Sequence, residues 1–138
     1  MQEFQLMILS ADCDFYEGPC ESLVVPTLDG QRGILANHSN YIEAIAPGEL
    51  KFTIPGEKPR YAFVSEGMVK VEDNEVLVLV DSAERPEDID ENRARREEAL
   101  AKEALLQKAS YREYKETQAN LKRSMIRLKV KNDHDLGM

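Results

Sequence analysis

The residues best suited to bind a ligand lie in the segment EDIDENRARRE, residues 87 to 97. Its core is Ile89-Asp90-x-x-Arg93-Ala94, in which Asp90 has the position of a helix N-cap. Backbone amides at a helix start are available to a ligand, and an arginine supplies a planar cation. A helix start also explains these residues without a ligand, because Asp90 can cap it and Arg93 can pair with Glu97 one turn later. The residues alone favour this structural role.

Arg123 and Arg127 are the other candidate cations for an anionic ligand. On a helix they lie one turn apart on the same face. A triphosphate requires more positive charge than Arg93 offers, and a folded helical pair could bring these two arginines to it. The alternative is that both side chains are simply solvated.

Other features of the sequence do not predict a catalytic or metal site. His38 has no second ligand at metal-binding spacing, and no set of nucleophile, histidine and acid stands out. Gly30 and Gly33 are interpreted as turn glycines, because no Gly-Lys-Ser/Thr follows to make a phosphate loop. The basic run in residues 122–131 is typical of a helix C-terminus. No nucleic-acid partner is expected, because the remainder of the chain is too acidic.

Charge is distributed unevenly along the 138 residues. Residues 1–85 contain 15 acidic and 6 basic residues, whereas residues 86–138 contain 11 and 12. This asymmetry indicates two parts with different partners. No apolar run is long enough to span a membrane, and the N-terminus lacks the basic flank of a secretion signal. Cys13 and Cys20 are expected to be reduced, which indicates a cytoplasmic location.

Short apolar segments separated by turn residues fill residues 3–81. The expected strands are FQLMIL, SLVVPT, GELKFTI, RYAFVS, GMVKVE and EVLVLVD. Asp29-Gly30 and Asp73-Asn74 are expected at hairpin tips. Strands at this spacing, with no helical pattern among them, predict an antiparallel sandwich or barrel. The last strand is apolar on both faces, so we expect it to lie between two layers.

After Pro86 the pattern becomes helical. Residues 90–108 contain no Gly or Pro and consist mostly of strong helix formers. The expected apolar stripe of this first helix comprises Ala94, Ala101, Ala104 and Leu105. A second helix is expected to begin with a capping box at Ser110, and its expected seam comprises Tyr114, Leu121, Met125 and Leu128. The tail, residues 132–138, is expected to be frayed. Such a pair buries little apolar area, so we expect it to be marginally stable and able to detach.

Four segments in order resemble the epsilon subunit of bacterial F-type ATP synthase, and the resemblance covers essentially the whole chain. They are LDGQRGILANH (28–38), APGEL (46–50), SEGMVKV (65–71) and VLVDSAERPEDID (78–90). The chain departs from the family pattern at Ala36, where proline is common, and at Glu66 and Met68, where glycine and phenylalanine are common. The resemblance implies an α+β, mainly β fold. A ten-stranded antiparallel β-sandwich in residues 1–85 would be followed by a C-terminal α-helical hairpin in residues 86–138.

The resemblance also implies a role and partners. In that family the sandwich binds the gamma subunit and the c-ring subunits of the rotating central stalk. The hairpin either folds against the sandwich or extends along gamma toward the alpha and beta subunits, where it inhibits ATP hydrolysis. The subunit has no catalytic residues and requires no cofactor. It reaches the cytoplasmic face of the bacterial plasma membrane only as a peripheral part of the complex. Gln31, Arg32 and His38 are the implied interface residues.

Some bacterial members of the family bind ATP through an Ile/Leu-Asp-x-x-Arg-Ala motif, which implies a regulatory ATP site here. The residues that match it, with the arginines and the acid associated with it, are Glu84, Ile89, Asp90, Arg93, Ala94, Arg123 and Arg127. Leu100 stands where some binding members carry an arginine, which predicts weaker binding. Bound ATP would join the two helices and favour the folded posture, in proportion to its differential affinity for the two postures.

Two other functions remain as alternatives to a rotor subunit. A freestanding ATP-sensing or protein-docking module would not co-purify with a gamma subunit. A hydrolase on a β-sandwich would require a catalytic set that the sequence does not display. Within the rotor hypothesis, Lys122, Arg123 and Arg127 could instead meet an acidic patch on the alpha–beta ring when the hairpin is extended.

Overall fold

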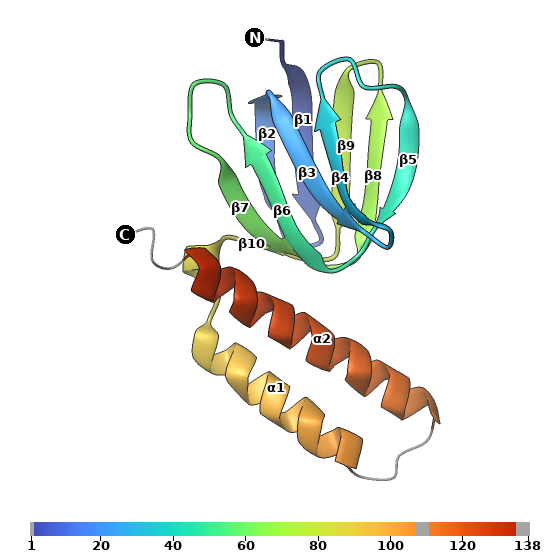
Figure 1. Ribbon diagram of the computed structural model, residues 1–138, viewed down its shortest axis with the longest axis vertical. Coiled ribbons are helices and arrows are strands. Elements are labelled where there is room, and N and C mark those ends of the chain that lie inside the picture. Colours follow the sequence, from blue (N-terminus) through green and yellow to red (C-terminus); the bar gives the residue numbers. More distant parts are fainter. Residues whose placement is uncertain (1, 107–110, 135–138) are drawn as a thin grey trace. The chain divides into compact units, whose positions relative to one another are not determined.

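The chain forms two compact units, Met1–Arg85 and Pro86–Met138, in a computed structural model that describes residues 2–106 and 111–134. The first unit consists of β-strands and the second of helices (Figure 1). The change coincides with Pro86, after which the period-2 alternation of apolar residues gives way to helix-forming residues.

The first unit contains strands that are short and alternate between buried and exposed side chains. In chain order they are β1 (Phe4–Ser10), β2 (Asp14–Cys20), β3 (Ser22–Thr27), β4 (Gly30–Leu35), β5 (Tyr41–Ile45), β6 (Gly48–Thr53), β7 (Arg60–Val64), β8 (Gly67–Glu72), β9 (Glu75–Val80) and β10 (Ala83–Glu84). The six strands expected from the sequence correspond to β1, β3, β6, β7, β8 and β9. The apolar pattern did not indicate β2, β4, β5 and β10, whereas the ten strands implied by the resemblance are all present.

One hydrogen-bonded sheet runs in the order β10-β7-β6-β3-β5-β8-β9-β1-β2, and β4 pairs with β3. The sheet folds over into two layers that enclose the core (Figure 1). Its pairs are antiparallel except for β1 and β9, which are parallel. The predicted β-sandwich is therefore confirmed, with one parallel pair that the sequence pattern did not indicate.

The core lies between the two layers and draws its residues from this unit alone. Leu6 and Ile8 of β1, Leu23 of β3 and Val78 of β9 are all fully buried. Complete burial of such a side chain contributes about 1.5–3 kcal/mol. The unit thus has a hydrophobic core that needs no helix to complete it.

One face of β9 covers the core, and the other does not. Val76, Val78 and Val80 are buried, whereas Leu77 is half-buried and Leu79 is 37% exposed. The prediction that this strand lies between two layers is therefore wrong. Apolar residues on a second face can equally form a surface for a partner.

The two predicted hairpin tips are both present. Asp73 and Asn74 join β8 to β9 with φ of 50° and 65°, the positive values that a tight hairpin turn demands. Gly30 follows the β3–β4 tip with φ of 109°. Gly33, by contrast, lies within β4 opposite Val24, so its interpretation as a turn glycine is wrong. Pairing with β3 holds this glycine-containing segment extended although its intrinsic strand preference is weak.

Segment 65–71 depends on a close approach between β8 and β9. A Cβ atom at Gly67 would collide with the carbonyl oxygen of Leu79. Beside it, the backbone N–H of Ser82 donates to Ser65 Oγ at 2.7 Å, and the N–H of Ser65 donates to the Ser82 carbonyl at 3.0 Å. The packing of the sandwich thus explains Ser65 and Gly67 in the segment SEGMVKV.

The second unit begins with a short 3-10 turn, η1 (Pro86–Asp88), followed by α1 (Glu91–Leu106) and α2 (Tyr111–His134). The two helices pack against each other. Residue 110, at which the capping box was expected, lies outside the described residues. The tail prediction is wrong for residues 132–134, which continue α2 as far as His134; residues 135–138 lie outside the described part.

The buried face of the hairpin differs in part from the expected seam. Ala94, Ala101 and Leu128 are buried as expected, but Met125 is 51% exposed. Its neighbour Ser124 is buried instead. The side chains of Leu105 and Tyr114 lie outside the described part. The apolar spacing was misleading because a polar residue, Ser124, occupies the buried face of α2 toward α1.

The two cysteines are both free, as predicted, but they differ in environment. Cys13 is exposed, whereas Cys20 is fully buried, and this burial raises the pKa of its thiol.

With a thiol reagent at pH 8, we expect Cys13 to react at once. Cys20 should react at least about a hundredfold more slowly, because it requires opening of the sandwich. Stopped-flow measurement on a Cys13→Ser variant should show the slow phase alone; two equal rates in the parent chain would contradict the assignment.

Candidate functional site

The first residues of α1 form a capped helix start. The backbone N–H of Arg93 donates to Asp90 Oδ1 at 3.0 Å, and that of Ala94 donates to the Asp90 carbonyl at 2.9 Å. Ile89 and Ala94 are only 3% and 2% exposed. Asp90 is therefore the N-cap, and the two apolar residues of the motif contribute to packing within this structure.

A single carboxylate joins the arginines of the two helices. Glu97 on α1 accepts a hydrogen bond from Arg93 Nε through Oε1 at 3.0 Å. Its other oxygen, Oε2, lies 3.7 Å from Nη1 of Arg127 on α2. The predicted pairing of Arg93 with Glu97 is thus present, and the structure extends it across the hairpin.

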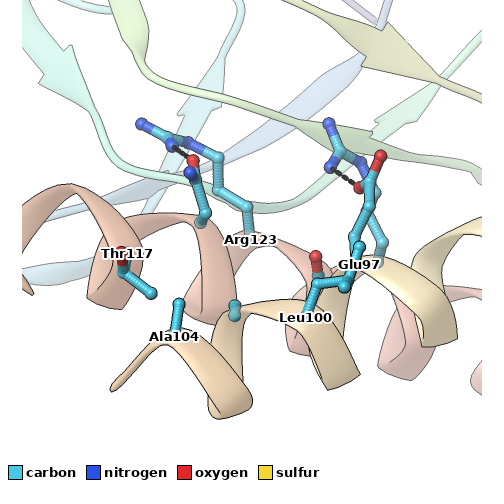
Figure 2. Close-up of a pocket in the computed structure, with 9 residues that line it drawn as sticks. Glu97, Leu100, Ala104, Thr117 and Arg123 are labelled. Carbon is cyan, nitrogen blue, oxygen red and sulfur yellow. Dashed lines mark hydrogen bonds and ion pairs between the residues drawn. The ribbon is translucent and has the colours of Figure 1, made fainter. Parts of the chain in front are cut away.

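Next to this cluster is a groove between α1 and α2, hereafter the interhelical groove, with a volume of about 440 Å³ (Figure 2). It is lined by Glu97, Leu100, Ala101, Ala104, Thr117, Asn120, Arg123, Ser124 and Arg127. Its α1 wall contains two alanines, which leave space between the helices. Its α2 wall is polar, and Arg123 donates there to Asn120 Oδ1 at 2.9 Å.

The chemistry of the groove suits an anion with several oxygen atoms. Arg123 and Arg127 provide guanidinium donors in one wall, and Arg93 lies beside the same carboxylate as Arg127. Guanidinium groups bind phosphates and carboxylates in bidentate fashion. Thr117 and Asn120 add neutral polar groups for the less charged part of a ligand.

The structure brings together some of the predicted site residues but not all. Arg123 and Arg127 line the interhelical groove, and Arg93 pairs with Glu97, which lines it too. Asp90 immediately precedes α1 and caps it, about two turns before Glu97. Glu84 belongs to the first unit, where it lies in β10 and pairs with Phe63 of β7. The residues that line the interhelical groove all belong to the second unit.

Three polar residues of the groove were not predicted from the sequence. Thr117, Asn120 and Ser124 precede Arg127 at spacings of three, four and three residues, so they share one face of α2. This polar stripe was a detectable signal. The expected apolar seam drew attention to the neighbouring face instead.

The predicted interface residues lie on the sandwich. Arg32 on β4 forms a bidentate pair with Glu43 on β5, with Nε–Oε1 and Nη2–Oε2 distances of 2.8 and 3.1 Å. This pairing lowers the pKa of Glu43 and raises that of Arg32. Gln31 is exposed on the same strand. The pair presents a nearly neutral polar patch toward solvent.

His38 has a structural environment. Its Nδ1 lies 2.8 Å from the carbonyl oxygen of Ser39, and its ring is 4.9 Å from that of Tyr41. Within the described residues, no three histidine, cysteine or acidic side chains are grouped so that they could hold a metal ion. Among those same residues, no helix is both long and apolar enough to cross a membrane.

Comparison with known families assigns the two units separately. The family model for the ATP synthase delta/epsilon chain, beta-sandwich domain, matches residues 3–86. The model for the long alpha-helix domain of the same chain matches residues 87–132. This boundary coincides with the division between the two units of the structure.

Individual relatives extend over nearly the whole chain. The ATP synthase epsilon chain of Ruminiclostridium cellulolyticum is 37% identical over 132 residues, covering 96% of this chain and 98% of its own. That of Caldanaerobacter subterraneus is 40% identical over 128 residues, covering 92% of each. A chain in a structure of the Euglena gracilis mitochondrial ATP synthase shares the fold, with a TM-score of 0.72 at 20% identity over 98% of this chain and 81% of that one.

A β-sandwich followed by a helical hairpin, matched in order by both family models, defines a subunit class of the F-type ATP synthase. The full-length relatives narrow that class, and the chain belongs to the family of ATP synthase epsilon chains.

Proposed function

We propose that this epsilon chain is a non-catalytic regulatory subunit of the central stalk. Its sandwich docks on the gamma and c-ring subunits, and its hairpin regulates ATP hydrolysis at the alpha and beta subunits. The two family models and the epsilon-chain relatives support the assignment. The similar Tetrahymena thermophila chain, with a TM-score of 0.66, comes from a structure described as central stalk and c-ring. The chain would then lie at the cytoplasmic face of the plasma membrane, held there by the complex.

The division into two units supports a sandwich that docks and a hairpin that moves. The sandwich has a closed core of its own. The hairpin, by contrast, buries mainly small residues such as Ala94 and Ala101 along α1. At about 25 cal/mol per Å², such a stripe contributes little against the entropy of ordering two helices. A hairpin of this kind can change posture at low cost.

The proposed regulatory ligand of the hairpin is ATP. The observation that carries this proposal is the cluster in which Arg93 of α1 and Arg127 of α2 meet beside the interhelical groove. Phosphates bound there would contact both helices at once. A ligand that requires both helices in place stabilises the folded hairpin by its differential affinity. ATP would therefore favour the posture that permits hydrolysis.

Co-purification tests the docking role directly. A tagged chain expressed with its own gamma subunit should retain gamma through gel filtration, because the sandwich carries the docking surface. A freestanding ATP-sensing or protein-docking module would leave gamma in a separate fraction. The control is gamma expressed without the tagged chain, which should not be retained.

A further inference from the structure

The carboxylate of Glu97 contacts two of the arginines that the proposed ATP site assigns to the phosphates. It is 3.0 Å from Arg93 Nε and 3.7 Å from Arg127 Nη1. Carboxylate and phosphate oxygens accept hydrogen bonds from a guanidinium group in the same way. Glu97 and a phosphate therefore compete for the same guanidinium donors of these two arginines.

The charge in the interhelical groove makes this competition important. Among the described lining residues, Glu97 is the one acidic side chain, and Arg123 and Arg127 are the cations. Leu100, which lines the same groove, contributes no charge and is 65% exposed. The negative charge of Glu97 thus offsets a large part of the positive charge available to an anion there.

We propose that Glu97 is an internal competitor of the phosphates, which sets the affinity of the hairpin for nucleotide. The proposal rests on the ATP site proposed above. In the ligand-free hairpin, Glu97 holds Arg93 and Arg127 in a link between α1 and α2. When a polyphosphate binds, the Glu97 side chain turns away and the phosphates take over that link. Helices α1 and α2 are then linked in both states, by Glu97 in the free hairpin and by the phosphates in the bound one.

This arrangement predicts a dependence on ligand charge. The repulsion between Glu97 and a ligand increases with the number of phosphates near it. Removing the charge of Glu97 should therefore improve the binding of ATP more than that of AMP. A residue that only stabilised the helix would change the affinities for both nucleotides by the same factor.

The test is calorimetric titration of the full chain and of its Glu97→Gln variant with ATP, AMP and inorganic tripolyphosphate, each with and without Mg²⁺. Glutamine has nearly the size of glutamate and keeps one acceptor oxygen, but it removes the charge. We expect the affinity for ATP without Mg²⁺ to increase by about tenfold and that for AMP by about twofold. The gain should diminish in high salt, because the pair is partly exposed.

Glu98→Gln is the matched control. Glu98 is the next residue of α1 and pairs with Lys102 four residues later at 2.8 Å, but it does not line the interhelical groove. This variant has the same change in net charge, so its affinities should stay within about twofold of the parent chain. A gain in Glu97→Gln no larger than that in Glu98→Gln would overturn the proposal.

The outcomes separate this inference from the ATP site itself. If the parent chain binds ATP and Glu97→Gln binds it equally well, the competitor is refuted and the ATP site stands. If only Glu97→Gln binds tripolyphosphate and neither chain binds ATP, the competitor is supported and the ATP site is refuted. Weaker binding of Mg-ATP by Glu97→Gln would show that the carboxylate holds the ligand through the metal ion, which overturns the inference.

Discussion

Replacing Arg93 and Arg127 together by alanine should lower the affinity of the full chain for ATP by about a hundredfold or more. Charge-assisted hydrogen bonds contribute about 1.5–3 kcal/mol each, and every 1.4 kcal/mol is about tenfold. Arg127 is the better shielded of the two, since its side chain is 20% exposed against 73% for Arg93. We therefore expect the Arg127→Ala change to account for most of the loss.

The control for this experiment is Arg95→Ala. Arg95 is on the same helix and pairs with Glu91 at 2.7 Å, but it is not among the residues of the interhelical groove. Its loss should change the affinity for ATP by less than about threefold. Titration calorimetry measures both variants, and circular dichroism checks that their helix content is unchanged. Binding by the Arg93→Ala/Arg127→Ala chain within twofold of the parent would rule out the proposed site.

Removing residues 86–138 should leave a folded sandwich that still holds gamma but no longer restrains hydrolysis. The hydrophobic core lies wholly within the first unit, so its free energy of folding does not require the helices. In the assembled ATP synthase, loss of an inhibitory arm should raise the rate of ATP hydrolysis by about fivefold or more, since couplings of this kind usually correspond to 1–3 kcal/mol.

Two measurements decide this second prediction. Thermal unfolding of residues 1–85 should remain cooperative, and complexes containing the shortened chain should keep their full content of gamma. The matched control removes only residues 135–138, which should leave hydrolysis at the parent rate. Loss of gamma along with the helices would contradict a docking sandwich, and an unchanged rate with gamma retained would contradict a regulatory hairpin.

The sequence predicted the sandwich well where strands face the core on one side. FQLMIL and GMVKVE alternate, and both became strands at the expected residues. Two of the missed strands, β2 and β4, contain Gly or Pro, which disfavour β-structure in isolation. Strand β2 contains Gly18 and Pro19, yet it pairs along its length with β1 at the end of the sheet. An edge strand tolerates proline because one side of it needs no hydrogen-bonded partner.

The candidate site was predictable in its residue types but not in its arrangement. Asp90 at a helix start and Arg93 four residues before Glu97 follow from local spacing, and the structure contains both contacts. That spacing does not predict that Arg127, 30 residues after Glu97, approaches the same Glu97 carboxylate. That contact depends on how the two helices align when α2 returns along α1.

Local patterns in this chain thus specify six of the ten strands, the two helices, where the chain divides, and which side chains carry charge. They do so because hydrogen bonding and amphipathic periodicity act over a few residues. The parallel pairing of β1 with β9, the exposed face of β9 and the position of Glu97 between two arginines come from contacts between distant segments. Such contacts depend on packing in three dimensions. The residues that meet in them are far apart in the sequence, as Gln5 is from Glu75 and Glu97 is from Arg127.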